Sequence, residues 1–381
     1  MAKKKTIKLK NPFVNQGYMG PEYFCDRQAE TELILNHFNN NRNITLVAPR
    51  HIGKTGLIKH AFNQIESQNK NAICLYIDIF ATKNIRDFTE MFGSTIINGF
   101  ADSEKSFLNK ATTLLSSLRP VFTSDPFTGM PKMTITVDAS HAQLTIQQIF
   151  ELLKRSKREI YIAIDEFQQI ANYPEEGTEA LLRSHIQFAE GVHFIFAGSK
   201  YHLMAEMFGS PKRPFFQSTE MMELKPLDKE VYYSFANGFF EKKRGSLDHD
   251  TFMGLYNLFD GHTSYIQNLL NRLYDGCLHV KSMDEVNCEI VRLVESKSPQ
   301  YESMTQFLSS NQFNLLKAIA SDGLVKEPTG GKFIRQHNLL SASMVQSALR
   351  ALVDKEIVYR TSQGYIVYDR FMGIWLKRTF G

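Results

Sequence analysis

Apolar residues gather in short runs at five places in the first 226 positions of the chain. The strands expected there are residues 43–48, 72–80, 159–166, 192–199 and 219–224. Between most of them, apolar residues recur every three or four positions, the spacing of a helix with one buried face. In the first such helix, after Asp26, the shared face would hold Glu30, Leu33, Ile34, His37 and Phe38. The pattern predicts an α/β domain, a parallel sheet with helices on both faces.

Two further segments, residues 119–124 and 132–137, alternate apolar and polar side chains. They flank Asp125-Pro126-Phe127-Thr128-Gly129, which is rich in turn-forming residues. Alternation on both sides of a turn is typical of a hairpin. We therefore expect a β-hairpin insertion at about 119–137, between the second and third strands of the sheet.

After Pro226 the strand pattern stops and apolar residues follow at helical spacing, with Asp228 and Gly261 placed as helix caps. The four groups are Val231/Phe235/Phe239, Phe252/Leu255/Tyr256/Phe259, Ile266/Leu269/Leu270/Leu273 and Ile290/Leu293/Val294. They predict an α-helical lid of roughly four helices.

From residue 305 the order of elements changes again. Helical spacing marks residues 313–320 and 332–337, and Ser341 is placed to cap a third helix. Alternating segments then surround Ser362-Gln363-Gly364, which completes the order of a winged helix-turn-helix. The expected division is a basic tail and lead-in at 1–22, the sheet domain at 23–226, the lid at 227–300 and a winged helix domain at 305–381.

Length and composition agree with several domains. The chain has 381 residues, of which 43% are hydrophobic, so two or three domains can each bury a core. The longest apolar runs are a few residues long, so no membrane partner is expected, and the N-terminal lysines precede no apolar signal segment. Four cysteines without metal-ligand spacing predict reduced, mostly buried thiols of a cytoplasmic protein, with no structural metal.

Charge is distributed unevenly. The first ten residues carry a net charge of +5, residues 305–381 carry another +5, and the remaining middle carries −6. Basic ends indicate a polyanionic partner, although a five-lysine tail is also typical of a solvated terminus.

The first candidate site follows the first expected strand. Ala48-Pro49-Arg50-His51-Ile52-Gly53-Lys54-Thr55-Gly56 joins that strand to a helix, the setting of a phosphate-binding loop. Its backbone N–H groups would point at the phosphates of ATP or ADP, Lys54 would bridge the β- and γ-phosphates, and Thr55 would offer a hydroxyl to Mg²⁺. Ala48 stands where glycine is usual, but a residue leaving a strand has a negative φ. The alternative is an accidental Gly-Lys-Thr in a strand-to-helix turn.

Two acids end the third expected strand. In a Walker B arrangement Asp165 holds the Mg²⁺ shell, and Glu166 is the catalytic residue that orients and polarises the attacking water. Strands often end in acids, but the phosphate-binding loop upstream makes the pair specific. An adjacent Asp-Glu pair is typical of one class of ATPases. In that class, the strand before the phosphate-binding loop has as its neighbours in the sheet strands that are not adjacent to it in the sequence.

Two other catalytic candidates have open alternatives. Ser199 follows a buried strand, where a polar side chain can sense the γ-phosphate, but it is equally placed to cap a helix that starts near Tyr201. Arg213, in Pro211-Lys212-Arg213-Pro214, could stabilise γ-phosphate charge as an arginine finger, whereas a solvated loop arginine is the more frequent case.

Segments across the chain match the pattern of one family. They are Phe24-Cys25-Asp26-Arg27-Gln28-Ala29-Glu30, Pro49-Arg50 with Gly53-Lys54-Thr55, Ile164-Asp165-Glu166-Phe167-Gln168, Gly261-His262-Thr263-Ser264-Tyr265, and Tyr365-Ile366-Val367-Tyr368-Asp369-Arg370-Phe371 with Trp375. The chain thereby resembles the archaeal-type ATPase family, a branch of the STAND/AAA+ P-loop ATPases also common in bacteria, and a bacterial member is expected. Thr263 and Arg370 stand where the family has proline.

The resemblance implies ATP binding and hydrolysis, with ATP/ADP and Mg²⁺ as cofactors. It places the segment of Asp26 and Arg27 near the adenine, and Gly261 and Thr263 in the lid's contact with the nucleotide. The family switches between closed and open domain arrangements, with partners that differ from member to member.

Three functions remain open: a nucleotide-dependent switch, a DNA-binding regulator with an auxiliary ATPase, and a protein-interaction module with a slow ATPase. The expected recognition helix, residues 341–350, carries a single basic residue, Arg350. The other cations of the winged helix domain include Lys332, Arg335, Arg360 and Arg370. DNA binding and a protein-switch role for this domain are therefore about evenly supported.

Overall fold

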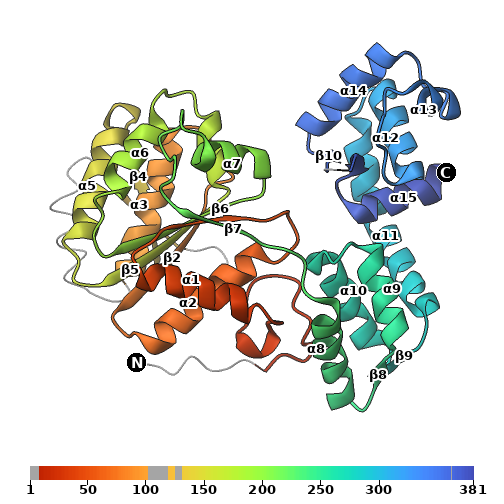
Figure 1. The fold of residues 1–381 in the computed structure, drawn as a ribbon, viewed down its shortest axis with the longest axis horizontal. Helices are drawn as coiled ribbons and strands as arrows, with labels where there is room; N and C mark the ends of the chain where they lie inside the picture. Colours follow the sequence, from red (N-terminus) through yellow and green to blue (C-terminus); the bar gives the residue numbers. More distant parts are fainter. Residues whose placement is uncertain (1–7, 102–118, 125–130, 362) are drawn as a thin grey trace. The chain divides into compact units, whose positions relative to one another are not determined.

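The computed structural model describes residues 8–101, 119–124, 131–361 and 363–381 (Figure 1). It consists of two compact units, which we describe separately. The first extends to Phe235 and also includes Asp260–Asn268, and the second comprises Ala236–Phe259 and Leu269–Gly381. Residues 1–7 of the basic tail, the expected turn at 125–129 and Ser362 lie outside the described residues. The domain limits expected from the sequence stay predictions.

A five-stranded parallel sheet forms the centre of the first unit. Its strands are β1 (Ile44–Val47), β2 (Ala72–Asp78), β5 (Glu159–Asp165), β6 (Val192–Gly198) and β7 (Glu220–Glu223). All four pairings are parallel, in the order β2-β5-β6-β1-β7. The predicted strands and their parallel arrangement are confirmed. The strand β1, which precedes the expected phosphate-binding loop, lies between β6 and β7 rather than beside β2, as the Asp-Glu pair predicts.

Side chains of each strand alternate between two cores, because successive residues point to opposite faces of the sheet. On β5, Ile160, Ile162 and Ile164 belong to one core, and Tyr161 and Ala163 to the other. Helices α1 (Gln28–Asn39) and α2 (Lys54–Gln68) cover the second face. The first is covered by α3 (Ile85–Ala101), α5 (Ala142–Lys154), α6 (Thr178–Ile186) and α7 (Tyr201–Gly209), as Figure 1 shows. Helices on both faces are therefore confirmed.

The buried face of α1 differs from the expected one. Thr31, Ile34 and Phe38 are buried, whereas Leu33 is exposed. Leu33 and Ile34 are neighbours about 100° apart around the helix, and the helix turns Ile34, not Leu33, toward the core. Apolarity alone therefore placed Leu33 wrongly.

The expected hairpin is present beside α3. Strands β3 (Arg119–Ser124) and β4 (Pro131–Thr136) are antiparallel, from Arg119 opposite Thr136 to Ser124 opposite Pro131. The backbone N–H of Ile135 donates to Ser94 Oγ of α3 at 3.0 Å, and that of Val137 donates to Glu90 Oε1 at 2.9 Å. The insertion is thus attached to the helical layer rather than to the central sheet.

The second unit holds most of the helical lid. Helix α8 (Lys229–Lys242) enters it from the first unit, and α9 (His249–Leu258), α10 (Thr263–Gly276) and α11 (Met283–Gln306) follow. Asp228 accepts hydrogen bonds from the N–H groups of Glu230 and Val231, which is the expected cap. Val231 itself is exposed and does not belong to the core. The expectation that strands stop after Pro226 is wrong, because β8 (Ser246–Leu247) pairs with β9 (His279–Val280). Two residues are too few to show alternation.

The C-terminal region has the elements of a winged helix. They are α12 (Ser310–Asp322), α13 (Gly331–Gln336), α14 (Ala342–Asp354), β10 (Val358–Arg360), β11 (Tyr365–Val367) and α15 (Arg370–Phe380). Strands β10 and β11 are antiparallel, and Ser341 caps α14 by accepting from the N–H of Met344. The predicted order is confirmed. The final helix α15 was not predicted, because its residues were assigned only to a family signature.

That signature attaches α15 to α11 within the second unit. Asp369 caps α15 by accepting from the N–H groups of Phe371 and Met372, and its other oxygen accepts from the hydroxyl of the buried Tyr301 at 3.0 Å. Trp375 is buried and donates its indole N–H to Ser298 Oγ at 2.9 Å. Because both contacts join a residue of α11 to α15, this part of the signature has a structural role.

The variant Asp369→Ala is expected to destabilise the second unit by about 2–3 kcal/mol. It removes a helix cap and leaves the buried Tyr301 hydroxyl without its acceptor. Trp375 is the chain's single tryptophan, so its fluorescence during urea unfolding reports on this unit. The control is Asp354→Ala, which removes an exposed carboxylate from the last turn of α14. Because a negative charge at this end of a helix is unfavourable, its removal should cause no loss of stability. Equal unfolding midpoints for Asp369→Ala and wild type would contradict the assignment.

All four cysteines are free. The expectation that they are mostly buried is wrong: Cys25 is buried, Cys74 and Cys277 are half-buried and Cys288 is exposed. Among the helices of the described residues, none combines the length and the apolarity needed to cross a membrane.

Candidate functional site

The loop between β1 and α2 has the backbone of a tight strand-to-helix turn. His51 and Gly53 adopt positive φ angles of 70° and 102°, and Gly53 precedes the first residue of α2. Ala48, which stands where glycine is usual, is fully buried and does not have a positive φ. The alanine therefore causes no backbone strain. The first N–H groups of α2 have no partner within the helix, so this end of α2 favours an anion.

Side chains and backbone from two distant segments fix the loop. The carbonyl oxygen of Ile52 accepts from Thr263 Oγ1 at 3.1 Å and from Arg27 Nη2 at 3.4 Å. The carbonyl oxygen of His51 accepts from the N–H of Ser264 at 2.9 Å. Proline has no hydroxyl, so Thr263 supplies a bond that the proline usual at this position could not make. Arg27, which is buried, thus contacts the loop backbone.

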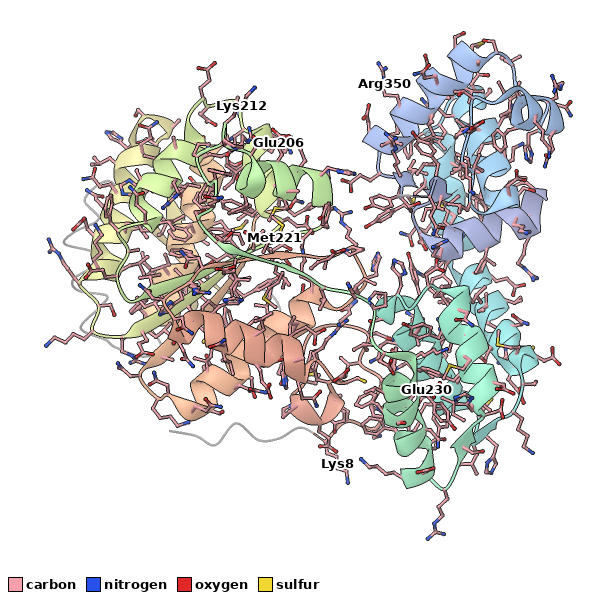
Figure 2. All side chains as sticks on the ribbon, in the orientation of Figure 1. Lys8, Glu206, Lys212, Met221, Glu230 and Arg350 are labelled. Carbon is pink, nitrogen blue, oxygen red and sulfur yellow. The ribbon has the colours of Figure 1, made fainter. Side chains whose placement is uncertain are left out.

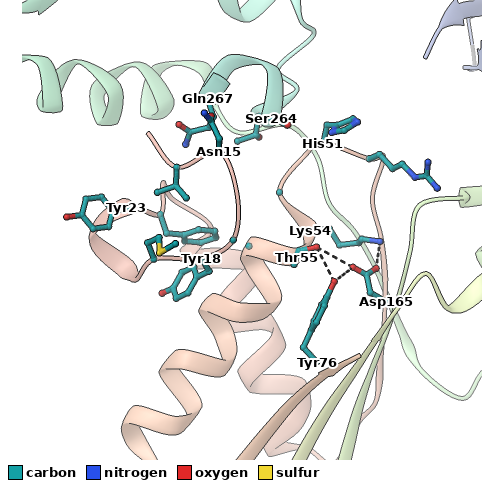
Figure 3. A pocket seen from close by; sticks show the side chains of 18 of the residues that line it. Asn15, Tyr18, Tyr23, His51, Lys54, Thr55, Tyr76, Asp165, Ser264 and Gln267 are labelled. Carbon is teal, nitrogen blue, oxygen red and sulfur yellow. Dashed lines mark hydrogen bonds and ion pairs between the residues drawn. The ribbon is translucent and has the colours of Figure 1, made fainter. Parts of the chain in front are cut away.

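The structure brings together four residues expected to act on a nucleotide. The ammonium of Lys54 forms ion pairs with Asp165 Oδ1 and, at 3.4 Å, with Glu166 Oε1. The hydroxyl of Thr55 donates to Asp165 Oδ2 at 3.3 Å, as Figure 3 shows. Side chains of Lys54 and Asp165 are 8% and 6% exposed, so water screens these charges weakly. The first turn of α2 and the carboxyl end of β5 meet at this point.

Glu166 is held by several contacts. Its backbone is left-handed, with φ 56°, a conformation that costs energy for a residue other than glycine and is frequent at functional sites. Its Oε2 accepts from Ser199 Oγ at 2.7 Å and from Gln168 Nε2. The N-cap of α7 is Lys200, so the alternative role of Ser199 as that helix's cap is wrong. Gln168 belongs to a matched family segment, but its role was not assigned from the sequence.

Lys54, Thr55, Asp165 and Glu166 line a pocket of about 440 Å³, whereas Ser199 and Gln168 are not among its lining residues. Its lining also includes Pro49, Arg50, His51, Gly53, Gly56, Thr263, Ser264, Gln267 and residues of the lead-in between Val14 and Phe24. Three rings lie together near the lead-in: Phe24 stacks on His60 with centroids 4.4 Å apart, and the Tyr18 hydroxyl lies 2.8 Å from His60 Nδ1. Burial raises the pKa of Tyr18 to about 12 and lowers that of His60. The Tyr18 phenol is therefore uncharged at neutral pH, and burial favours the neutral form of the His60 imidazole.

Several pocket residues were not identified from the sequence, and two of them lie on β2. Tyr76, on β2, donates its hydroxyl to Asp165 Oδ2 at 2.5 Å, and Asp78 ends the same strand opposite Asp165. Burial, followed by the neighbouring Asp165, raises the pKa of Tyr76 well above its usual range. Burial also raises the pKa of Asp78, against a hydrogen bond from the N–H of Phe80 that lowers it. The signal for Asp78 was available, because it is an acidic residue near the end of an expected strand, residues 72–80.

Other candidate residues lie elsewhere. Arg213 pairs with Glu179 at 3.0 Å and with Glu206, labelled in Figure 2, at 3.7 Å, and it does not line the pocket. It is neither a freely solvated arginine nor a neighbour of Lys54. Asp26 and Gly261 adopt positive φ angles but do not line the pocket. The buried Ile52 contributes its carbonyl group to the anchoring of the loop.

A magnesium ion fits the donors present. Thr55 and Asp165 offer a hydroxyl and a carboxylate at one point, and Mg²⁺ prefers hard oxygen ligands. Within the described residues, no group of three or more His, Cys, Asp or Glu side chains could hold a metal alone. In nucleotide sites Mg²⁺ takes one or two protein groups and completes its shell with phosphates and water.

Known structures share this fold. A Walker-type ATPase of Pyrococcus abyssi superposes with a TM-score of 0.63 at 15% identity, over 96% of this chain and 99% of that one. The Orc1 protein of Aeropyrum pernix, solved in complex with DNA, superposes with a TM-score of 0.58 at 13% identity, over 97% of each chain. No curated protein sequence matches the chain.

Two family models match the sequence. Residues 299–378 match a model described as "Probable winged helix domain", at the region where the structure has that fold. Residues 24–269, more than half of the chain, match the model of an "ATPase domain predominantly from Archaea". The bacterial source and the narrower STAND class stay predictions. The chain belongs to the ATPase family whose ATPase domain is found predominantly in Archaea, and it carries a C-terminal winged helix domain.

Proposed function

We propose that this protein binds ATP with Mg²⁺ in the 440 Å³ pocket, hydrolyses it to ADP and phosphate, and uses the cycle as a conformational switch. The observation that carries the proposal is the convergence of Lys54, Thr55, Asp165 and Glu166 at the carboxyl ends of β1 and β5. A cation, a metal-ligating pair and a base are the groups that phosphoryl transfer to water requires.

The two ends of the pocket bind different parts of the nucleotide. The loop backbone, the start of α2 and Lys54 hold the phosphates. The rings of Tyr18 and Phe24, which line the pocket at the lead-in, offer apolar surface and stacking to the adenine, and Phe24 is itself stacked on His60 of α2. When bound, Mg²⁺ neutralises phosphate charge and polarises the γ-phosphoryl group, and Thr55 and Asp165 would hold it.

In the proposed hydrolysis, Glu166 is the group that accepts a proton from the attacking water. A water oxygen attacks the γ-phosphorus, the bond to the bridging oxygen of ADP breaks, and the carboxylate of Glu166 accepts the proton of the water. Ser199 and Gln168 hold one oxygen of that carboxylate, which fixes its orientation. Lys54 carries the positive charge that opposes the charge developing on the phosphoryl oxygens.

The switch follows from the path of one helix. Thr263, Ser264 and Gln267 line the pocket at the start of α10, and α10 continues from Leu269 into the second unit. A ligand that changes the contacts of Thr263 and Ser264 with the loop acts on a helix that belongs to both units. The test of the proposal is phosphate release from ATP, which we expect with Mg²⁺ and not with excess EDTA. If no phosphate is released from ATP in the presence of Mg²⁺, the proposed hydrolysis is overturned.

A second candidate function, DNA binding, is favoured by the net charge of +5 in residues 305–381. Lys332 and Arg335 of α13 and Arg360 of β10 are exposed, whereas α14 carries Arg350 as its single cation (Figure 2). Cations outside the recognition helix contact backbone phosphates and do not read bases. We therefore expect weak, non-specific binding of duplex DNA.

Fluorescence anisotropy of the full chain at several salt concentrations tests this expectation. Each phosphate contact contributes about −0.9 to the log–log slope of affinity against salt. The double variant Lys332→Ala/Arg335→Ala should weaken binding and make the slope less negative by about 2. The matched double variant Lys225→Ala/Lys229→Ala, which removes the same charge outside the winged helix, should behave as wild type. If the protein does not bind DNA at low salt at concentrations up to about 10⁻⁴ M, DNA binding is overturned and the protein-switch role remains for the winged helix domain.

A further inference from the structure

Asp165 is oriented by a residue that the nucleotide-binding motifs do not include. Its Oδ2 accepts from two hydroxyl groups: that of Tyr76 at 2.5 Å and that of Thr55 at 3.3 Å. The two hydroxyl oxygens lie 3.4 Å apart. Its Oδ1 is occupied by Lys54 and by the backbone N–H of Glu166, at 2.9 Å. Both oxygens of the carboxylate are therefore engaged, each by two groups (Figure 3).

The sheet places Tyr76 where it can reach Asp165. Tyr76 pairs in register with Ala163 on the neighbouring strand, and Asp165 follows Ala163 by two residues on the same face. Such diagonal neighbours are within reach of a long side chain. On its other side, the Tyr76 ring lies under the ammonium of Lys59, 5.3 Å from the ring centroid. Lys59 is on α2, four residues after Thr55, so the ring is fixed between β5 and α2.

We propose that Tyr76 is a positioning residue for the metal: its hydroxyl holds the Asp165 carboxylate in the orientation that, with Thr55, binds Mg²⁺. The inference rests on the proposed function, because it concerns the same site. Partners that hydrogen-bond to a metal-ligating carboxylate commonly change metal affinity by about 10–100-fold. Tyr76 does not touch the phosphates in this role, so nucleotide binding without metal should not depend on its hydroxyl.

Tyr76→Phe separates the hydroxyl from the ring, because phenylalanine keeps the contact with Lys59. The measurement is the binding of a fluorescent, non-hydrolysable ATP analogue, first in EDTA and then at increasing Mg²⁺ concentration. We expect wild-type affinity in EDTA and a half-saturating Mg²⁺ concentration raised about 10–100-fold. Tyr161→Phe is the matched control: it removes a hydroxyl from β5 that donates to Glu159 at 3.1 Å, outside the pocket, and should leave the Mg²⁺ midpoint unchanged.

A second variant distinguishes positioning from packing. Tyr76→Leu also lacks the hydroxyl but loses the ring, so it should melt at a lower temperature than Tyr76→Phe while showing a similarly raised Mg²⁺ midpoint. A wild-type Mg²⁺ midpoint in the folded variants would overturn the role of Tyr76 and leave the proposed function intact. Wild-type protein that binds no nucleotide, or binds it without regard to Mg²⁺, would overturn both.

Discussion

The variant Lys54→Ala is expected to lose all measurable affinity for ATP and to remain folded. Lys54 begins α2 beneath the loop, and its ammonium is the cation placed against Asp165 and Glu166. Wild-type protein should gain about 2.7 kcal/mol of stability at an ATP concentration one hundred times its Kd, whereas the variant should gain none. Thermal unfolding followed by circular dichroism, with and without Mg²⁺-ATP, measures the difference.

The fold should survive the loss of this ammonium, because Asp165 keeps its bonds from Tyr76, Thr55 and the backbone of Glu166. Some loss of stability is expected, since two carboxylates then lie close together without a cation. The matched control is Lys70→Ala, an exposed lysine just beyond the end of α2, which should show the wild-type ATP shift. Equal ATP shifts in Lys54→Ala and wild type would show that the nucleotide binds elsewhere.

The fold was predictable where the physical signal is local. Buried parallel strands are continuous apolar runs, so β5 and β6 were located to within one residue at each end. The position of β1 between β6 and β7 is a long-range property, and only the Asp-Glu pair indicated it. The pair of β8 and β9 gave no signal, because each has two residues and the pairing joins segments that lie far apart in the sequence.

The residues of the candidate site were likewise predictable only where their sequence signal is local. Lys54, Thr55, Asp165 and Glu166 follow from a strand-loop-helix and a strand ending in acids, each readable over about ten residues. Tyr76 does not, because an aromatic residue in an expected strand is read as core, and only the register of β2 against β5 brings its hydroxyl to Asp165. The contacts of Arg213 with Glu179 and Glu206 depend on tertiary packing, which its loop sequence does not encode.

The variant Glu166→Gln is expected to bind ATP with wild-type affinity and to turn it over at least about 100-fold more slowly. General bases contribute about 10²–10⁴ to the rate, and glutamine cannot accept the proton of the attacking water. Its amide oxygen can still accept from Ser199 and Gln168, and Lys54 keeps Asp165, so the geometry should change little. Phosphate release at saturating Mg²⁺-ATP gives kcat, and equilibrium binding gives the affinity separately.

Glu159→Gln is the control for this variant, because it makes the same substitution at the other end of the same strand. Glu159 is exposed and accepts from Asn69 and Tyr161, outside the pocket, so its loss should leave kcat unchanged. A Glu166→Gln variant with wild-type kcat would remove Glu166 from the mechanism and make Asp78, the other carboxylate of the pocket beside Asp165, the next candidate for the base. A variant that instead lost ATP affinity would show that Glu166 acts through Lys54 in binding. The separation of kcat from affinity therefore decides between a base and a binding group.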